Sequence, residues 1–147
     1  MDPDIRQFYL FSKVSEAGLV AFLKGSRARV FADNDVIYDV GDEPDCVYVV
    51  LEGAVRIEVP LPEGDSLFLG VAPAATLLGD HEALCHTYSV ARIAAVGDAR
   101  VLCVPRENFL HLFKSEPEFT QLLAQQFAMT MRMMCLAAAH HFNSRAD

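Results

Sequence analysis

The sequence predicts a mainly β domain with helices at both of its ends. From about residue 27 to 105, short runs of β-branched and aromatic residues are interrupted by turn residues, at intervals typical of an all-β sandwich or barrel. The segments 4–24 and 106–142 instead carry apolar residues at helical spacing. Because 147 residues suffice for a sizeable core, we expect one domain that spans residues 1–147.

The N-terminal segment 4–24 carries signals for the start and the end of a helix. Ser15 is a suitable N-cap for the apolar positions that follow it, and Gly25 is a suitable stop. We therefore expect a helix between these two residues.

Within the β region, three patterns predict strands and their ends. Val55, Ile57 and Val59 alternate with polar residues, which is typical of a strand with one face in water. The runs 46–51 (CVYVVL) and 101–104 (VLCV) are almost wholly apolar and predict strands covered on both faces. Turns are expected at several positions, including Glu52-Gly53 and Gly97-Asp98.

The final helix is predicted from about Pro117 to Phe142, with Ser115 and Glu118 forming a capping box at its start. It carries two apolar stripes. The first is an a/d-type seam, which we expect to form a homodimer interface and which consists of Phe119, Leu122, Gln126, Met129, Met133 and Leu136. The second consists of Leu123, Phe127, Met131, Met134 and Ala138. The alternative is a helix buried on both sides in its own core.

The composition of the chain indicates which partners and which cellular compartment to expect. The net charge of −8 does not favour nucleic acid, because binding to phosphates depends on Lys and Arg. No apolar run approaches the roughly 18 residues of a membrane-spanning helix, and the N-terminus lacks signal-peptide features. We expect a cytoplasmic protein without a membrane segment. The four cysteines are widely spaced, and we expect them to be reduced and mostly buried.

In this order, the segments resemble the cyclic nucleotide-binding domain shared by catabolite-activator-type regulators, kinase regulatory subunits and gated channels. The resemblance covers residues 8–142. The residues that carry it are Leu10-Phe11, Val36-Ile37, Gly41-Asp42, the run from Tyr48 to Ile57, Gly79-Asp80 and the run from Val104 to Phe109. It implies a double-stranded β-helix, that is, a jelly-roll-like β-roll, followed by a long C-terminal helix. It also implies a sensor whose ligand changes the packing of that helix and the geometry of the dimer.

The resemblance further implies a ligand loop that begins with Gly-Glu and ends with Arg, a small residue and Ala. In such a loop the Glu accepts from the ribose hydroxyl and the Arg pairs with the cyclic phosphate. The corresponding residues in this sequence are Leu78, Gly79, Asp80, His81, Ser89, Val90 and Ala91. Asp80 replaces the Glu, and Ser89 stands at the position of the Arg. Loss of an Arg–phosphate bond worth about 1.5–3 kcal/mol weakens binding by about one to two orders of magnitude. A cyclic nucleotide is therefore an uncertain small-molecule effector.

Two other functions remain open from the sequence. His81 and Cys85 have i, i+4 spacing, and Glu82 and His86 lie beside them, so a haem or metal sensor is one alternative. A ligand-free module for dimerisation or protein interaction is the other. We expect no enzyme, because no His-x-His set, Ser-His-Asp order or Walker loop is present. We also expect no helix-turn-helix domain and no direct contact with nucleic acid.

Overall fold

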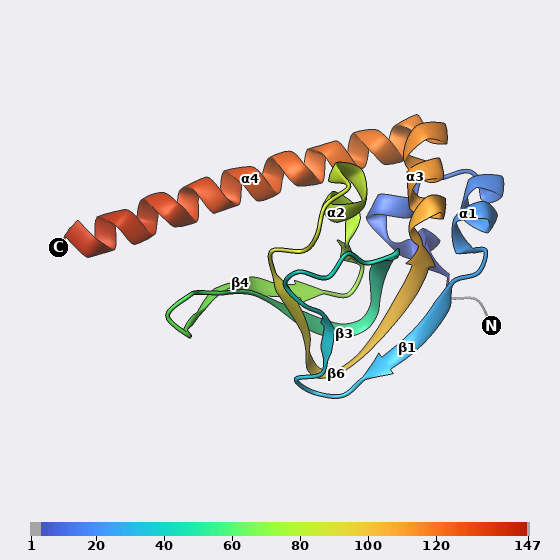
Figure 1. The fold of residues 1–147 in the computed structure, drawn as a ribbon. Helices are drawn as coiled ribbons and strands as arrows, with labels where there is room; N and C mark the ends of the chain where they lie inside the picture. The colour runs from blue at the N-terminus through green and yellow to red at the C-terminus, as the bar shows by residue number, and fades with distance from the viewer. Residues whose placement is uncertain (1–3, 147) are drawn as a thin grey trace.

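The computed structural model describes residues 4–146, with side chains described through Asn143. Helical turns at the N-terminus, an antiparallel sheet and two C-terminal helices follow one another along the chain (Figure 1). The N-terminal elements are η1 (Ile5–Gln7), η2 (Tyr9–Phe11) and α1 (Glu16–Leu23). The strands are β1 (Arg27–Phe31), β2 (Val36–Tyr38), β3 (Cys46–Pro60), β4 (Ser66–Pro73), β5 (Leu77–Leu78) and β6 (Arg92–Pro105). The remaining helices are α2 (Asp80–Cys85), α3 (Arg106–Ser115) and α4 (Pro117–Ala146).

The sheet is built around β3 and β6, which pair with each other along most of their length. The strand order is β1-β6-β3-β4, with β2 paired to β6 and β5 paired to β3. All of these pairings are antiparallel. The predicted fold class, mainly β with flanking helices and a long C-terminal helix, is confirmed.

The predicted strand breaks at Glu52-Gly53 and Gly97-Asp98 are wrong. Both positions lie inside continuous strands, β3 and β6, whose pairing register shifts around Glu52. Gly53 and Gly97 have φ values of +83° and +65°, so each lets a long strand bend without ending it.

The apolar side chains form two clusters on either side of the strands. One lies between the sheet and the helices and contains Phe11, Phe22, Phe109 and Phe119. The other fills the β-roll and contains a stacked Tyr38–Tyr48 pair with ring centroids 5.3 Å apart. The apolar run of β3 lies between the clusters, with Val47 and Val49 in the first and Tyr48 and Val50 in the second. The prediction of a strand covered on both faces is confirmed there.

The two predicted helix starts have different outcomes. Ser15 caps α1 as predicted, because its hydroxyl accepts from the Gly18 N–H at 3.0 Å. The capping box at Ser115 is wrong, because Ser115 is the last residue of α3 and its hydroxyl donates to the His111 carbonyl. The junction residue Glu116 instead accepts from the backbone N–H and the hydroxyl of Ser15, which ties the α3–α4 junction to α1.

Helix α4 is packed only at its N-terminal end. Phe119 and Leu123 are fully buried in the helical cluster, whereas every residue from 124 to 143 is exposed. The alternative of a helix buried on both sides is therefore wrong. Phe119 is also wrong as a dimer-interface residue, because its ring packs against Phe11 and Phe109 of its own chain. Within residues 4–146, no helix has the length and apolar character needed to cross a membrane.

The cysteines are free, but they are not buried as expected. Cys85 and Cys135 are exposed, and Cys46 and Cys103 are half-buried. The difference arises because Cys135 lies on the exposed part of α4 and Cys85 ends the short helix α2.

Candidate ligand-binding site

The predicted ligand loop connects β5 to β6 and contains the short helix α2. Gly79 precedes α2 with φ +82°, and a Cβ placed there would lie 3.3 Å from the Cys46 carbonyl oxygen. Glycine therefore suits both the backbone conformation and the close approach to β3. Beyond α2, Ser89 forms two backbone hydrogen bonds of 2.8 Å with the 41–42 turn, one to Asp42 and one from Gly41. These bonds fix the end of the loop against the turn after β2.

All three buried polar or charged residues of the described chain lie in this loop. They are Asp80, Glu82 and Ser89, and the other buried side chains are hydrophobic. Buried polar groups destabilise a fold unless they find partners, so their concentration within one segment marks it as unusual.

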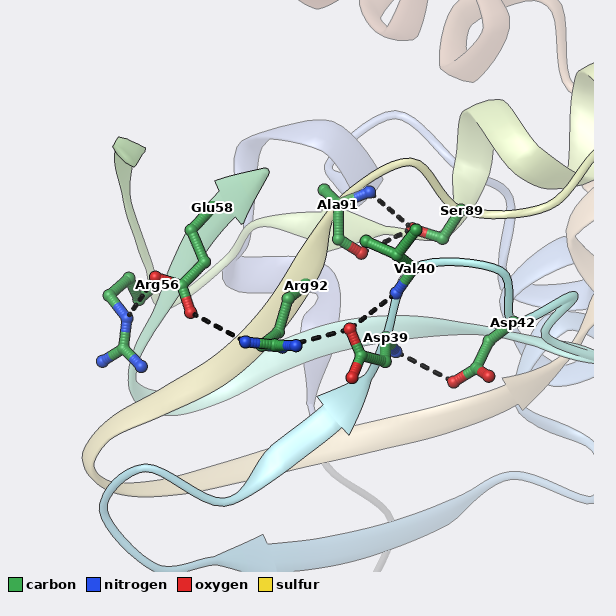
Figure 2. Close-up of polar contacts among 8 residues, drawn as sticks. All are labelled: Asp39, Val40, Asp42, Arg56, Glu58, Ser89, Ala91 and Arg92. Carbon is green, nitrogen blue, oxygen red and sulfur yellow. Dashed lines mark hydrogen bonds and ion pairs between the residues drawn. The ribbon is translucent and has the colours of Figure 1, made fainter. Parts of the chain in front are cut away.

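Ser89 uses its hydroxyl within the loop. It donates to the Ala91 carbonyl at 2.8 Å and accepts from the Ala91 N–H at 3.2 Å (Figure 2). The Ser89 hydroxyl thus bonds to the nearby backbone of Ala91, and it offers no positive charge.

Glu82 is the most deeply buried charged residue that the structure describes, with 2% of its surface exposed. Neither of its carboxylate oxygens accepts a hydrogen bond. The His81 Nε2 lies 3.0 Å from one of them in an ion pair without hydrogen-bond geometry. Burial opposes ionisation, but the neighbouring His81 and Ser89 side chains outweigh it and hold the pKa of Glu82 below its ordinary value. His81 in turn has a raised pKa, chiefly because of Glu82.

Asp80 and Tyr38 complete the buried part of the site. Burial raises the pKa of Asp80 to about 6, although His81 acts in the opposite direction. The pKa of Tyr38 is raised, first by burial and then by the charges of Glu82 and Asp80. The Tyr38 side chain, on β2, therefore lies within electrostatic reach of both carboxylates and extends the site into the β-roll.

Arg92, the arginine nearest to the loop in sequence, belongs to the outer face of the β-roll. Its guanidinium lies between the carboxylates of Asp39, at 3.1 Å, and Glu58, at 4.0 Å (Figure 2). The next residue, Ile93, is in the buried cluster, and adjacent strand residues point to opposite faces. Arg92 therefore does not replace the missing arginine in this conformation.

The predicted site residues occupy different environments. Leu78, Gly79, Asp80 and Ser89 are buried, Ala91 is half-buried, and His81 and Val90 are exposed. The sequence prediction omitted Glu82 and Tyr38 from the site. Burial of Glu82 depends on which way a six-residue helix faces, and that helix is too short for a reliable periodic signal.

The described side chains do not form the cluster of ligands that a metal sensor would need. Among them, no three His, Cys, Asp or Glu residues lie close enough to hold a metal ion. Of the pair that suggested it, both His81 and Cys85 are exposed.

Two prominent cavities lie away from the loop. One, of about 520 Å³, is bounded by the 74–76 turn, Tyr9 and the segment of α4 from Leu122 to Thr130. The other, of about 240 Å³, is lined by residues that include Arg27, Cys46 and Cys103. Neither is lined by residues 78–91, whose inner side adjoins the filled core of the β-roll.

The family is established by comparison with known proteins. Residues 28–116, more than half of the chain, match the family described as "Cyclic nucleotide-binding domain". The chain belongs to this family.

Solved structures of regulatory proteins share the fold. The catabolite activator protein of Thermus thermophilus is 25% identical, with a TM-score of 0.74 over 88% of this chain and 61% of that chain. The sensor domain of the transcriptional regulator DNR from Pseudomonas aeruginosa is 17% identical, with a TM-score of 0.76 over 89% of this chain and 88% of that one. The predicted resemblance is confirmed.

Among curated proteins, the chain is similar to a short part of a much longer enzyme. The lysophospholipase nte1 of Neosartorya fischeri is 29% identical over 97 residues, which is 66% of this chain and 6% of that protein. The chain thus spans only a small fraction of this relative.

Proposed function

We propose that this chain is a regulatory sensor domain whose small-molecule ligand binds at the loop 78–91. The observation that carries the proposal is the gathering of all the buried polar residues described, Asp80, Glu82 and Ser89, in that one segment. Residues 28–116, which include this loop, match the cyclic nucleotide-binding domain family, and the resemblance of the loop to the family's ligand loop supports the proposal. A cyclic nucleotide is the first candidate, although Ser89 makes its binding weak.

The signal would pass from the loop to α4 and from there to the geometry of a homodimer. Helix α2 contacts α3, and α3 contacts α4, so a shift of the loop has a packed route to the long helix. The ligand changes this equilibrium only to the extent that it binds one arrangement more tightly than the other.

NMR titration of the wild-type protein with cAMP and cGMP tests ligand binding and detects affinities in the millimolar range. We expect shifts of the backbone amides of residues 79–91 and further shifts in α4. Without the arginine, binding should be about one to two orders of magnitude weaker than with it. A titration that leaves the amides of residues 79–91 unchanged for both nucleotides would contradict nucleotide binding.

A ligand-free interaction module is the second candidate. It is favoured by the filled core beside the loop and by the position of both prominent cavities elsewhere. Native mass spectrometry of the purified protein distinguishes the two. A small molecule that copurifies in stoichiometric amount and is lost on Asp80→Ala substitution would count against the module.

A further inference from the structure

Glu82 has a burial and a set of contacts that the stability of the fold does not explain. Its carboxylate is buried and lies within electrostatic reach of Ser89 and Tyr38. Neither of its oxygens accepts a hydrogen bond. Its ion pair with the exposed His81, at 3.0 Å, leaves both oxygens without a hydrogen bond. A buried carboxylate that accepts no hydrogen bond destabilises a protein relative to an apolar side chain of the same size, so its presence points to a donor from a ligand.

The charges around Glu82 determine which ligand group can meet it. From its own helix, Asp80 adds a second buried carboxylate, and the exposed His81 side chain pairs with both carboxylates when it is protonated. From the strand and turn packed against the loop come Tyr38, Asp39 and Asp42. None of the buried residues described is Lys or Arg, and Arg92 is held by Asp39 and Glu58. The interior of this site is therefore negative.

We propose that Glu82 determines ligand specificity at this site, where it favours a neutral or cationic group that donates hydrogen bonds, a hydroxyl or an amine, and disfavours a phosphate. This inference rests on the proposed ligand site at residues 78–91. Like charges in a poorly solvated site repel more strongly than in water, so the Glu82 carboxylate disfavours an anion beside Ser89. A hydroxyl or ammonium group there would satisfy the carboxylate oxygens that lack donors.

The same geometry explains why an arginine at position 89 alone should not restore phosphate binding. An arginine introduced there would lie within electrostatic reach of Glu82, because the Ser89 side chain already does. A carboxylate pairs strongly with a guanidinium, so Glu82 would compete with the phosphate for it. Phosphate binding should therefore require both changes, an arginine at position 89 and the removal of the Glu82 charge.

The test compares a charged and a neutral ligand on the same variants. Backbone amides of residues 79–91 are followed by NMR during titration with cAMP and, separately, with adenosine, which lacks the phosphate. Glu82→Gln keeps the size of the side chain and removes its charge. Glu63→Gln, in the exposed hairpin turn between β3 and β4, makes the same change in net charge far from the loop. Ser89→Arg and Ser89→Arg/Glu82→Gln form a second pair of proteins.

We expect Glu82→Gln to bind cAMP about tenfold more tightly than wild type, with adenosine binding unchanged or weaker. Glu63→Gln should match wild type, and Ser89→Arg/Glu82→Gln should exceed Ser89→Arg by at least the same factor. If cAMP shifts the loop amides equally in wild type and Glu82→Gln, the role of Glu82 is overturned while the ligand site stands. If no folded variant responds to either ligand, the nucleotide-type site itself is overturned, and this inference with it.

Discussion

The buried Asp80 carboxyl makes the free energy of unfolding depend on pH. Burial raises the pKa of its carboxyl from 3.8 to about 6 in the folded protein. The folded state therefore holds the Asp80 proton more tightly than the unfolded state does. The stabilisation that this gives is complete below about pH 4 and disappears as the pH rises through 6.

The first prediction concerns Asp80→Asn, which removes this pH dependence. The free energy of unfolding of the variant, minus that of wild type, should rise between pH 4 and pH 7 by about 2–3 kcal/mol, since each pKa unit corresponds to about 1.4 kcal/mol. Urea denaturation at a series of pH values measures the difference. Asp65→Asn, in the exposed hairpin turn, is the control for loss of one carboxylate. A difference that does not change with pH would mean that Asp80 is not buried in its charged form.

At the residue scale, the sequence indicated part of the proposed site and omitted Glu82, the most deeply buried charged residue described. Gly79, Asp80 and Ser89 could be located because they occupy a recognisable motif, and all three are buried. Glu82 and Tyr38 could not, because their proximity depends on how β2 packs against α2, two elements separated by more than forty residues. Contacts of this kind leave no trace in local spacing.

At the scale of elements, the bends in β3 and β6 distinguish this sheet from a set of short hairpins. Gly53 combines a positive φ with a close approach, since an added Cβ would lie 2.4 Å from the Asp98 carbonyl oxygen. The paired strands β3 and β6 therefore approach each other closely at a point where only glycine fits. The sequence predicted turns there because glycine at positive φ serves equally in a turn and in a bent strand.

Substitution of Gly53 by Ala tests this close approach of β3 to β6. We expect Gly53→Ala to lower the free energy of unfolding by about 3 kcal/mol or more, because backbone strain and a backbone clash add together. Gly64→Ala is a matched control, since Gly64 also has a positive φ, +97°, but has nothing within 4 Å of an added Cβ. It should lose only about 1 kcal/mol. Equal losses in urea denaturation would show that the close approach of β3 to β6 contributes nothing.

At the scale of the whole molecule, α4 is the element whose apolar surface its own chain leaves uncovered. Its first turns are fixed in the helical cluster, and the rest of the helix extends from there to the C-terminus (Figure 1). All twenty residues from 124 to 143 are exposed. Most of the stability of a helix in a protein comes from packing of its apolar face, so we expect another surface to cover this segment. The sequence assigned Phe119 to the seam, although the helical core uses it.

We expect the partner of the seam to be a second copy of the chain. The exposed seam consists of Gln126, Met129, Met133 and Leu136, at the alternating spacing of a two-helix coiled coil. The net charge of −8 would oppose association of two copies, yet the segment 124–143 contains no Asp or Glu and one arginine, Arg132. Repulsion is therefore weakest where the two helices would meet.

The last prediction follows from this distribution of charge and apolar surface. Met133→Glu/Leu136→Glu should convert a dimer to a monomer in sedimentation velocity, because it buries two carboxylates per chain in an apolar seam. Met131→Glu/Met134→Glu makes the same chemical change on the second stripe and should leave the dimer intact. If both double variants dissociate alike, the two stripes share the interface and the seam is not specific. If the wild-type protein sediments as a monomer, α4 meets some other partner, and the route from loop 78–91 to dimer geometry is lost.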